Sequence, residues 1–274
     1  MFPYMGGKKQ HSTWISPYIP SNIKTYVEPF GGAMWVYWMS NKTPVETNVY
    51  NDYNRHLCNV FSCASDDPDL FKGVLMSYYD DLHNPEKFEQ YRDEVFSYRS
   101  IRFDIPDFNM AAKYMLLQMQ IFTGGDNLTE KSKIYIETKY KEKYKIFTEK
   151  LGDDKYLKKL AKLTVKNDDY RKIITEYDSK DTFFYVDPPY YNMEHYYTED
   201  DFDHADHMDL LRQLRSTNAR WALSYYHFPD LEIVLPRDEF VWHEEKTHSI
   251  NARVSSAERT ELLIMNYPMS LTFL

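Results

Sequence analysis

The pattern of apolar and polar positions along the chain predicts strands that alternate with helices. Short apolar runs typical of buried strands occur at residues 25–30, 45–50, 163–166, 182–186, 220–225, 239–243 and 260–267. Apolar residues recur at helical spacing at residues 33–40, 110–122 and 203–215. We therefore expect an α/β protein.

The first fifty residues predict the start of a doubly wound sheet. A strand leads into the turn Gly31-Gly32, a helix follows, and a second strand closes on Asn51-Asp52. This order is typical of sheets that bind a ligand at the carboxyl ends of their strands.

The middle of the chain differs from its two ends. Residues 54–163 contain mostly helical patterns and a turn at TGGDN, residues 123–127. We expect residues 1–53 and 164–274 to form one sheet domain, with residues 54–163 as a mostly helical insertion.

The composition is typical of a globular protein and argues against a membrane-spanning or disulfide-rich one. The chain is 43% hydrophobic and 27% charged, which is ordinary for a globular protein. No apolar run approaches the roughly 18–20 residues that a membrane span needs, and MFPYMGGKKQ lacks the apolar stretch of a signal peptide. Cys58 and Cys63 are too few for a disulfide framework, so we expect reduced thiols and a cytoplasmic protein.

Charge is distributed unevenly along the chain. The formal net charge is −9, yet residues 131–172 contain 14 Lys and Arg against 7 Asp and Glu. An acidic body with one basic segment can bind nucleic acid locally, although lysine-rich helical surfaces usually have no partner. The charge pattern alone leaves both interpretations open.

The turn Gly31-Gly32 and Asp52 are candidate parts of a cofactor site. Glycine lets the backbone approach a ligand closely, and a carboxylate at the next strand end can accept from both hydroxyls of a ribose. NAD-type cofactors and S-adenosylmethionine both use this combination. The chain lacks the G-x-G-x-x-G motif for a pyrophosphate, which favours S-adenosylmethionine.

The stretch FFYVDPPYYN, residues 183–192, ends an apolar strand with a carboxylate. Pro188 and Pro189 fix two φ angles and have no N–H, so this loop is stiff and the Pro188 carbonyl can accept from a ligand. Asp187 and this carbonyl form two acceptors at a fixed separation, and Tyr190 offers a flat face for stacking. The exocyclic amino group of a base has two donors at about that spacing.

This arrangement suits methylation of adenine at N6. The N6 lone pair is delocalised into the ring, and two acceptors on its hydrogens favour a more tetrahedral nitrogen with a localised pair. The nitrogen can then attack a sulfonium methyl group in line. Positioning and electrostatics supply most of the catalysis, so no metal is expected.

A second candidate site is the H-x-x-H formed by His204 and His207. This spacing can place two metal ligands on one helix face. No third ligand is evident in the sequence, so we expect surface histidines.

The residues already described resemble a known family. DPPY at 187–190 is similar to the catalytic motif of N6-adenine DNA methyltransferases, and the order of motifs resembles the Dam type (D12 class, alpha-group) of bacteria and phages. YMGGK at 4–8, EPFGG at 28–32 and NDYN at 51–54 resemble its cofactor motifs, and TELLIMNY resembles its closing strand. The resemblance implies a Rossmann-like methyltransferase sheet with an inserted target-recognition subdomain, in the cytoplasm of a bacterium or of a phage-infected host.

The resemblance also implies an activity and a set of roles. The expected reaction is transfer of a methyl group from S-adenosylmethionine to N6 of an adenine in double-stranded DNA, at a specific site, with a role in protection from restriction. Asp187, Pro188, Pro189 and Tyr190 would hold the adenine after it flips out of the stacked duplex. The residues expected to bind the cofactor are Tyr4, Lys8, Phe30, Gly32, Asp52, Asp169, Tyr170 and Asp187.

Two departures from the family pattern matter. Met34 stands where the fuller FxGxG pattern has a second glycine. The insertion has IFTGGDNLTEKSKIY, residues 121–135, in place of the arginine- and asparagine-rich segment that often reads DNA, so the family's GATC target does not transfer. The insertion and the basic stretch after it remain the candidates for DNA contact, with phosphate contacts predicted for Lys131, Lys133, Lys139 and Lys141.

Two rival functions remain at this stage. One is methylation of cytosine N4 or of an amide nitrogen in RNA or protein, although those enzymes often have Asn or Ser in place of Asp187. The other is a non-catalytic DNA-binding module on the same fold. The presence of Tyr4, Lys8, Asp52 and Asp187 argues against such a decayed site.

Overall fold

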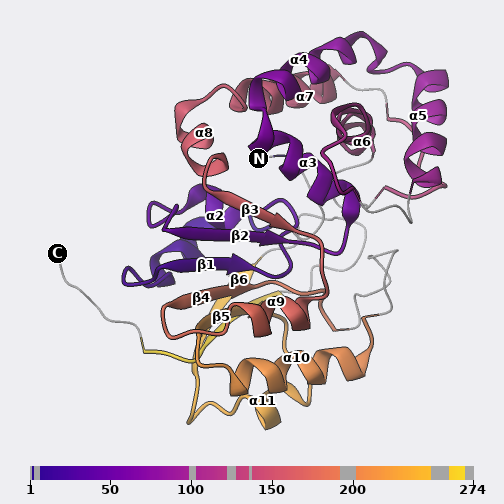
Figure 1. The fold of residues 1–274 in the computed structure, drawn as a ribbon. Coiled ribbons are helices and arrows are strands. Elements are labelled where there is room, and N and C mark those ends of the chain that lie inside the picture. The colour runs from indigo at the N-terminus through magenta and orange to yellow at the C-terminus, as the bar shows by residue number, and fades with distance from the viewer. Residues whose placement is uncertain are drawn as a thin grey trace.

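The protein is built on one mixed seven-stranded sheet (Figure 1). The computed structural model describes residues 2, 7–98, 103–121, 128–135, 138–191, 202–247 and 259–268. The strands are β1 (Thr25–Glu28), β2 (Thr47–Asn51), β3 (Leu163–Lys166), β4 (Thr182–Val186), β5 (Arg220–Tyr225), β6 (Val241–Thr247) and β7 (Arg259–Met265). Their order is β3-β2-β1-β4-β5-β7-β6, and only the pairs that involve β7 are antiparallel.

Helices cover both faces of the sheet (Figure 1). In this view α3 to α7 gather above the strands, whereas α9, α10 and α11 lie below them. The helices are α1 (Ser12–Ile15), α2 (Trp35–Met39), α3 (Arg55–Asp66), α4 (Pro68–Ser77), α5 (Pro85–Ser97), α6 (Phe108–Gln120), α7 (Thr138–Lys150), α8 (Asp154–Leu160), α9 (Tyr170–Glu176), α10 (His204–Ser216) and α11 (Leu231–Val234). Across the described ranges, no helix is both long and apolar enough to cross a bilayer.

The strands are apolar on both sides because each face packs on helices. In β4, Phe183 and Tyr185 belong to the core that includes α3, α4 and α6, while Phe184 and Val186 belong to the core under α9 and α10. This alternation follows from the two-residue period of a strand. A strand that is buried on both faces reads as a continuous apolar run, which is why FFYV is recognisable in the sequence.

The predicted α/β fold is confirmed. The strands predicted at 163–166, 182–186 and 220–225 match β3, β4 and β5 at both ends. The other predicted strands overlap β1, β2, β6 and β7, with ends that differ by up to four residues. Helices also form near the predicted positions, as α2, α6 and α10. The residues between β2 and β3 form α3 to α8, and α3 contacts both α6 and β3. The exact division into a sheet domain and an insertion stays a prediction.

A buried lysine joins α8 to the helix that follows the glycine turn. Lys159 is 3% exposed, and its Nζ donates to the carbonyls of Tyr37 and Ser40 and to the Thr43 Oγ1, at 2.5, 2.8 and 2.8 Å. The last carbonyls of a helix have no partner within the helix. Lys159 therefore satisfies carbonyl groups at the end of α2 and fixes α8 against that end of α2.

Candidate active site

The Asp-Pro-Pro-Tyr motif, residues 187–190, begins at the carboxyl end of β4. Val186 ends the strand, and Asp187 follows it directly, with 17% of its side chain exposed. The neighbouring strand β1 is parallel to β4 and ends at Glu28, so the glycine turn and Asp187 share one edge of the sheet. This is the edge at which such sheets bind ligands.

Lys8 lies directly on the Asp187 carboxylate. The Lys8 Nζ is 2.9 Å from Asp187 Oδ1 and 3.5 Å from Glu261 Oε1, and it lies 4.6 Å from the centre of the Tyr190 ring. The Tyr190 hydroxyl donates to Glu261 Oε1. One ammonium, two carboxylates and one phenol thus form a single cluster from three distant parts of the chain.

The charge of Asp187 is set by opposing neighbours. Burial is the largest effect and raises the pKa of Asp187, whereas the Lys8 ammonium lowers it and the Glu261 carboxylate raises it. Burial also raises the pKa of Tyr190 and of Tyr185, so both hydroxyls stay protonated. Lys8 therefore favours the ionised form of Asp187 most strongly within this cluster, and a hydrogen bond from Tyr190 lowers the pKa of Asp187 further.

The glycine turn is held by the end of β2. The Gly31 N–H donates to the Asn51 carbonyl at 2.7 Å, and the Gly32 N–H donates to Asp52 Oδ2 at 2.7 Å. The other Asp52 oxygen accepts from the Asn54 N–H at 2.8 Å. A carboxylate has about four acceptor positions, so these two bonds alone do not prevent Asp52 from accepting from a ligand.

Met34 occupies the position of the missing glycine in an unusual conformation. Its φ is 54° and its ψ is 39°, the left-handed region that favours glycine. Its N–H donates to the Gly31 carbonyl at 2.7 Å. Met34 thus adopts a backbone conformation that favours glycine without being glycine.

Phe30 and the Asp169-Tyr170 pair meet beside this turn. The Phe30 ring lies 5.0 Å from the Tyr170 ring and 5.8 Å from Phe202, so three aromatic side chains line this part of the edge. Asp169 begins α9 by accepting from the Arg171 N–H. Its carboxylate also pairs with the Arg171 guanidinium at 3.0 Å.

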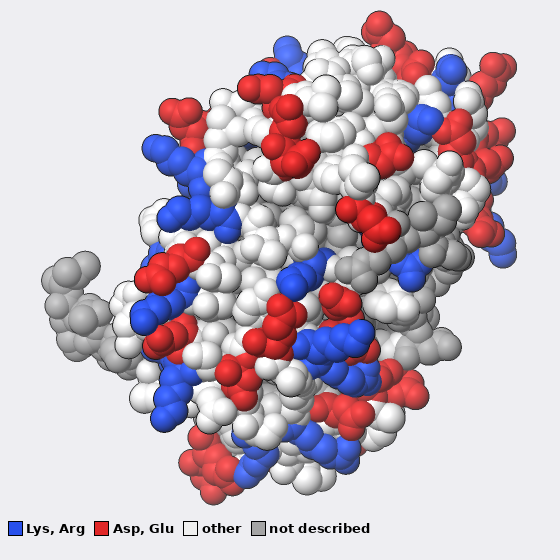
Figure 2. Space-filling model, in the orientation of Figure 1, with Lys and Arg blue, Asp and Glu red and all other residues white. Residues whose placement is uncertain are grey.

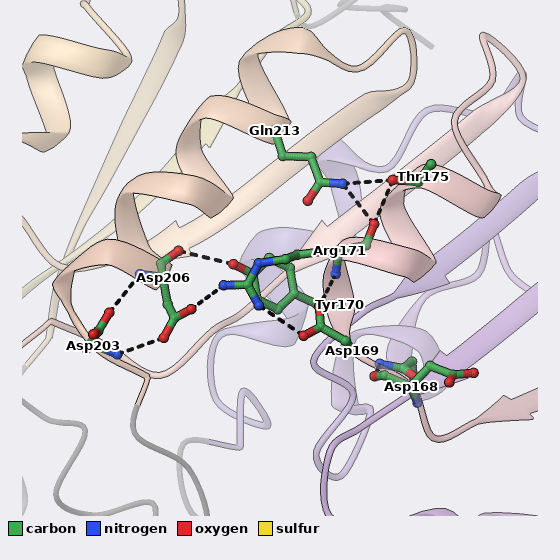
Figure 3. A network of polar contacts seen from close by, with 9 residues as sticks. Asp168, Asp169, Tyr170, Arg171, Thr175, Asp203, Asp206 and Gln213 are labelled. Atoms are coloured by element: carbon green, nitrogen blue, oxygen red, sulfur yellow. Dashed lines mark hydrogen bonds and ion pairs between the residues drawn. The ribbon is translucent and has the colours of Figure 1, made fainter.

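Arg171 connects α9 to α10 (Figure 3). The guanidinium bonds both the Asp169 and the Asp206 carboxylates, and the Tyr170 hydroxyl donates to the Asp206 carbonyl. Gln213 donates to the Arg171 carbonyl at 2.9 Å. These contacts fix Tyr170 on the side where Phe30 lies, and sequence reasoning did not find them.

Glu28 is a buried carboxyl group at the end of β1 that sequence reasoning assigned no role. It is 2% exposed, and its Oε1 accepts from the Tyr26 hydroxyl at 2.6 Å and from the Tyr37 N–H at 3.2 Å. Burial is the largest effect and raises its pKa from 4.5 to about 8, with a further rise from Asp187. Glu28 is therefore mostly protonated at neutral pH, which leaves fewer negative charges around Asp187.

We expect Glu28→Gln to change how the stability of the protein depends on pH. The folded pKa lies above the unfolded one, so the contribution of Glu28 is fully present below pH 4.5 and is lost as the pH rises through about 8. The variant should match the wild type near pH 5 and exceed it by roughly 2–4 kcal/mol near pH 9. Urea unfolding at the two pH values measures this, with the exposed Glu89→Gln as control. A constant difference between variant and wild type would contradict the shifted pKa.

The remaining predicted residues fall into two groups. Tyr4 lies outside the described residues. Lys131, Lys133 and Lys139 are exposed and Lys141 is partly exposed, with Lys141 over the Tyr79 ring at 5.6 Å and Lys139 over the Tyr140 ring at 5.1 Å. On the face drawn in Figure 2, Lys and Arg are interspersed with Asp and Glu.

The expectation of two surface histidines is wrong for His207. This residue is 1% exposed and bonds the Tyr225 hydroxyl through Nδ1, while His204 is exposed and lies 3.6 Å from Asp230. The first turn of α10 buries one side of the helix, and sequence spacing could not show that position 207 is on it. In the described part of the chain, no group of three or more His, Cys, Asp or Glu could hold a metal ion.

The fold and the family match together give the class of protein to which the chain belongs. The mixed seven-stranded sheet with helices on both faces (Figure 1) is consistent with a Rossmann-like methyltransferase fold. Residues 4–255 match the model of the D12 class N6 adenine-specific DNA methyltransferases, and the chain belongs to that family.

Two curated relatives are similar over most of their length. The Type II methyltransferase M.MjaIII of Methanocaldococcus jannaschii is 26% identical over 238 residues, which are 80% of each chain. The Type II methyltransferase M.CviBI of Paramecium bursaria Chlorella virus NC1A is 22% identical over 219 residues, which are 79% of this chain and 78% of the relative. The protein is thus a DNA adenine methyltransferase by family.

Proposed function

We propose that the protein transfers the methyl group of S-adenosylmethionine to N6 of an adenine flipped out of double-stranded DNA. The observation that carries the proposal is the position of Asp187, at the sheet edge shared with the glycine turn and in contact with Lys8, whose ammonium also lies over Tyr190. The methyl donor would supply an electrophilic sulfonium methyl group. The protein would bind, orient and desolvate the amino group that attacks it.

Asp187 and the Pro188 carbonyl are the proposed acceptors for the two N6 hydrogens. Tyr190 is the proposed stacking surface, but its ring is 7% exposed and the Lys8 ammonium lies over it. A base therefore reaches the ring only after a covering side chain moves. Lys8 contacts both Tyr190 and Asp187, so its displacement would open both at once.

The residues around the glycine turn fit the proposed cofactor. Asp52 can accept from ribose hydroxyls, Gly32 keeps the backbone close, and the Phe30 and Tyr170 rings offer an apolar wall for an adenine. The Asp169 carboxylate already pairs with Arg171, so it would have to contact the cofactor and Arg171 at the same time. We propose these residues, together with Lys8, Asp187 and Tyr4, as the cofactor site.

The role of Asp52 can be tested with a ligand that lacks one hydroxyl. We expect wild-type protein to bind S-adenosylhomocysteine at least about tenfold more tightly than its 2′-deoxyribose analogue, which corresponds to roughly 1.4 kcal/mol. Asp52→Asn should lose most of this preference, because its amide presents one acceptor in place of two. Calorimetric titration measures both ligands, with the exposed Asp238→Ala as control. Undiminished discrimination in Asp52→Asn would remove Asp52 from the ribose site.

We further propose that the helical insertion and the basic stretch after it contact DNA. Exposed lysines on and before α7 support this, since phosphate contacts need accessible cations. Replacing Lys131, Lys133, Lys139 and Lys141 together by Gln should reduce the slope of log K against log salt. The expected reduction is about 0.9 for each phosphate that the variant no longer neutralises.

Binding of a DNA duplex at several salt concentrations measures this slope. The control is the double variant Lys24→Gln with Lys180→Gln, because both residues precede their strands and lie at the edge opposite to the site; it removes two charges where the test variant removes four. A slope unchanged in the quadruple variant would place the DNA contacts elsewhere. The names of the relatives support a further proposal, that methylation by this protein protects DNA from restriction in the cytoplasm of a bacterium or of an infected host.

A further inference from the structure

Glu261 is a buried carboxylate in the middle of the catalytic cluster. It lies near the start of β7, is 2% exposed and is followed by the apolar residues Leu262 to Met265. A lone buried carboxylate is costly, so it needs partners. Among the described residues, Glu261 contacts the Tyr190 hydroxyl and the Lys8 ammonium, the latter at 3.5 Å.

Both of these residues lie beside Asp187, the proposed hydrogen-bond acceptor for the N6 amino group. Lys8 contacts Asp187 at 2.9 Å, and Tyr190 follows Asp187 in the same loop. The Tyr190 ring is held at its hydroxyl by Glu261, while Tyr226 packs edge-on against it at 4.5 Å. Glu261 is thus the group that links the strand β7 to the catalytic loop.

We propose that Glu261 is a positioning residue for methyl transfer, which fixes the Tyr190 ring and holds the Lys8 ammonium beside Asp187. The proposal rests on the roles proposed above for Asp187 and Tyr190. Glu261 gives the Lys8 ammonium an acceptor at 3.5 Å in addition to Asp187. When an adenine amino group approaches Asp187, Lys8 can turn to Glu261 and remain charged and paired.

The charges around Asp187 give this role a signature in the pH profile. Asp187 faces Lys8 from the N-terminal segment, Glu261 from β7, Glu28 from β1, and the protonated hydroxyls of Tyr185 and Tyr190. Removing the Glu261 charge should lower the pKa of Asp187, and removing the Lys8 charge should raise it. The two changes should therefore move the acidic limb of the pH–rate profile in opposite directions.

The test is single-turnover methyl transfer to a DNA duplex by the full chain from pH 5 to 9. We expect Glu261→Gln to keep an acceptor for Tyr190, to react within about tenfold of the wild-type rate, and to shift the acidic limb to lower pH. Lys8→Met should shift it to higher pH. The exposed Glu244→Gln on β6 should shift nothing.

A double-mutant cycle tests the contact with Tyr190 separately. Tyr190→Phe should slow the wild type severalfold but cost clearly less in Glu261→Leu, because the hydroxyl has already lost its Glu261 acceptor and keeps only its bond with Asp187. An unmoved acidic limb in Glu261→Gln, with additive effects in the cycle, would make Glu261 a structural residue only. If Glu261→Leu does not fold, the isosteric Glu261→Gln decides alone. A wild type that transfers no methyl group would overturn the roles of Asp187 and Tyr190, and this inference with them.

Discussion

Asp187→Ala should lower the rate of methyl transfer by at least about a thousandfold. The change removes the carboxylate that accepts from the N6 amino group, and positioned acceptors act mainly on the transition state. The fold should survive, because Lys8 keeps Glu261 as a partner at 3.5 Å. Cofactor affinity should stay within about tenfold, or roughly 1.4 kcal/mol. Single-turnover kinetics and calorimetric titration measure the two effects.

Two further variants test whether the loss of activity is due to the Asp187 carboxylate itself. Asp187→Asn keeps one acceptor oxygen and should retain part of the activity. Asp181→Ala changes an aspartate that precedes β4, at the opposite end of the same strand, where it pairs with Lys24 at 3.2 Å in an exposed position. Turnover near the wild-type rate in Asp187→Ala, or an equal loss in Asp181→Ala, would remove Asp187 from the mechanism.

Gly31→Ala should destabilise the protein by about 3 kcal/mol or more. A Cβ at this position would lie 2.3 Å from Tyr50 Cε2 and 2.5 Å from Tyr50 Cδ2. The Tyr50 ring is fully buried, and its hydroxyl donates to the Gly32 carbonyl at 3.0 Å, so neither the ring nor the turn has room to shift. We expect the Gly32 N–H to lose its Asp52 acceptor and cofactor affinity to fall at least about tenfold.

Gly73→Ala is the matched control for this prediction. Gly73 lies within α4 in an exposed position, and an added Cβ would meet nothing within 4 Å. The same change should therefore stabilise the protein by about 0.5–1 kcal/mol, because alanine is the better helix former. Urea unfolding and cofactor titration of both variants measure the contrast. A Gly31→Ala protein that is as stable as the wild type would contradict the steric account of the turn.

The strands of the sheet were predictable because their burial is local in the sequence. FFYV is an uninterrupted apolar run bounded by polar residues, and it matches β4 closely, whereas LTVK alternates apolar and polar residues and matches β3. Ends that depend on a tertiary contact were less predictable. β1 stops at Glu28 rather than at Phe30, since Phe30 turns away to pack against Tyr170.

Site residues that belong to a sequence motif could be predicted, whereas contacts that arise only from the fold could not. Asp187 and the Gly31-Gly32 turn stand out by sequence because their neighbours fix the backbone. Glu28 and Glu261 lie within the stretches EPFGG and TELLIMNY, but neither stretch shows that its acid approaches Asp187, because only the sheet order brings these residues together. Acidic residues at the boundary of a fully apolar strand are the signal that could have found both.

The measurement that tests the central claim most directly is single-molecule sequencing of DNA from cells that express the protein, with Asp187→Ala as control. The account predicts N6-methyladenine at one sequence motif with the wild type and none with the variant. Methylation spread over adenines without a motif would mean that the insertion reads the backbone rather than the bases. DNA without modified adenine in wild-type cells, or equal modification with Asp187→Ala, would contradict the account.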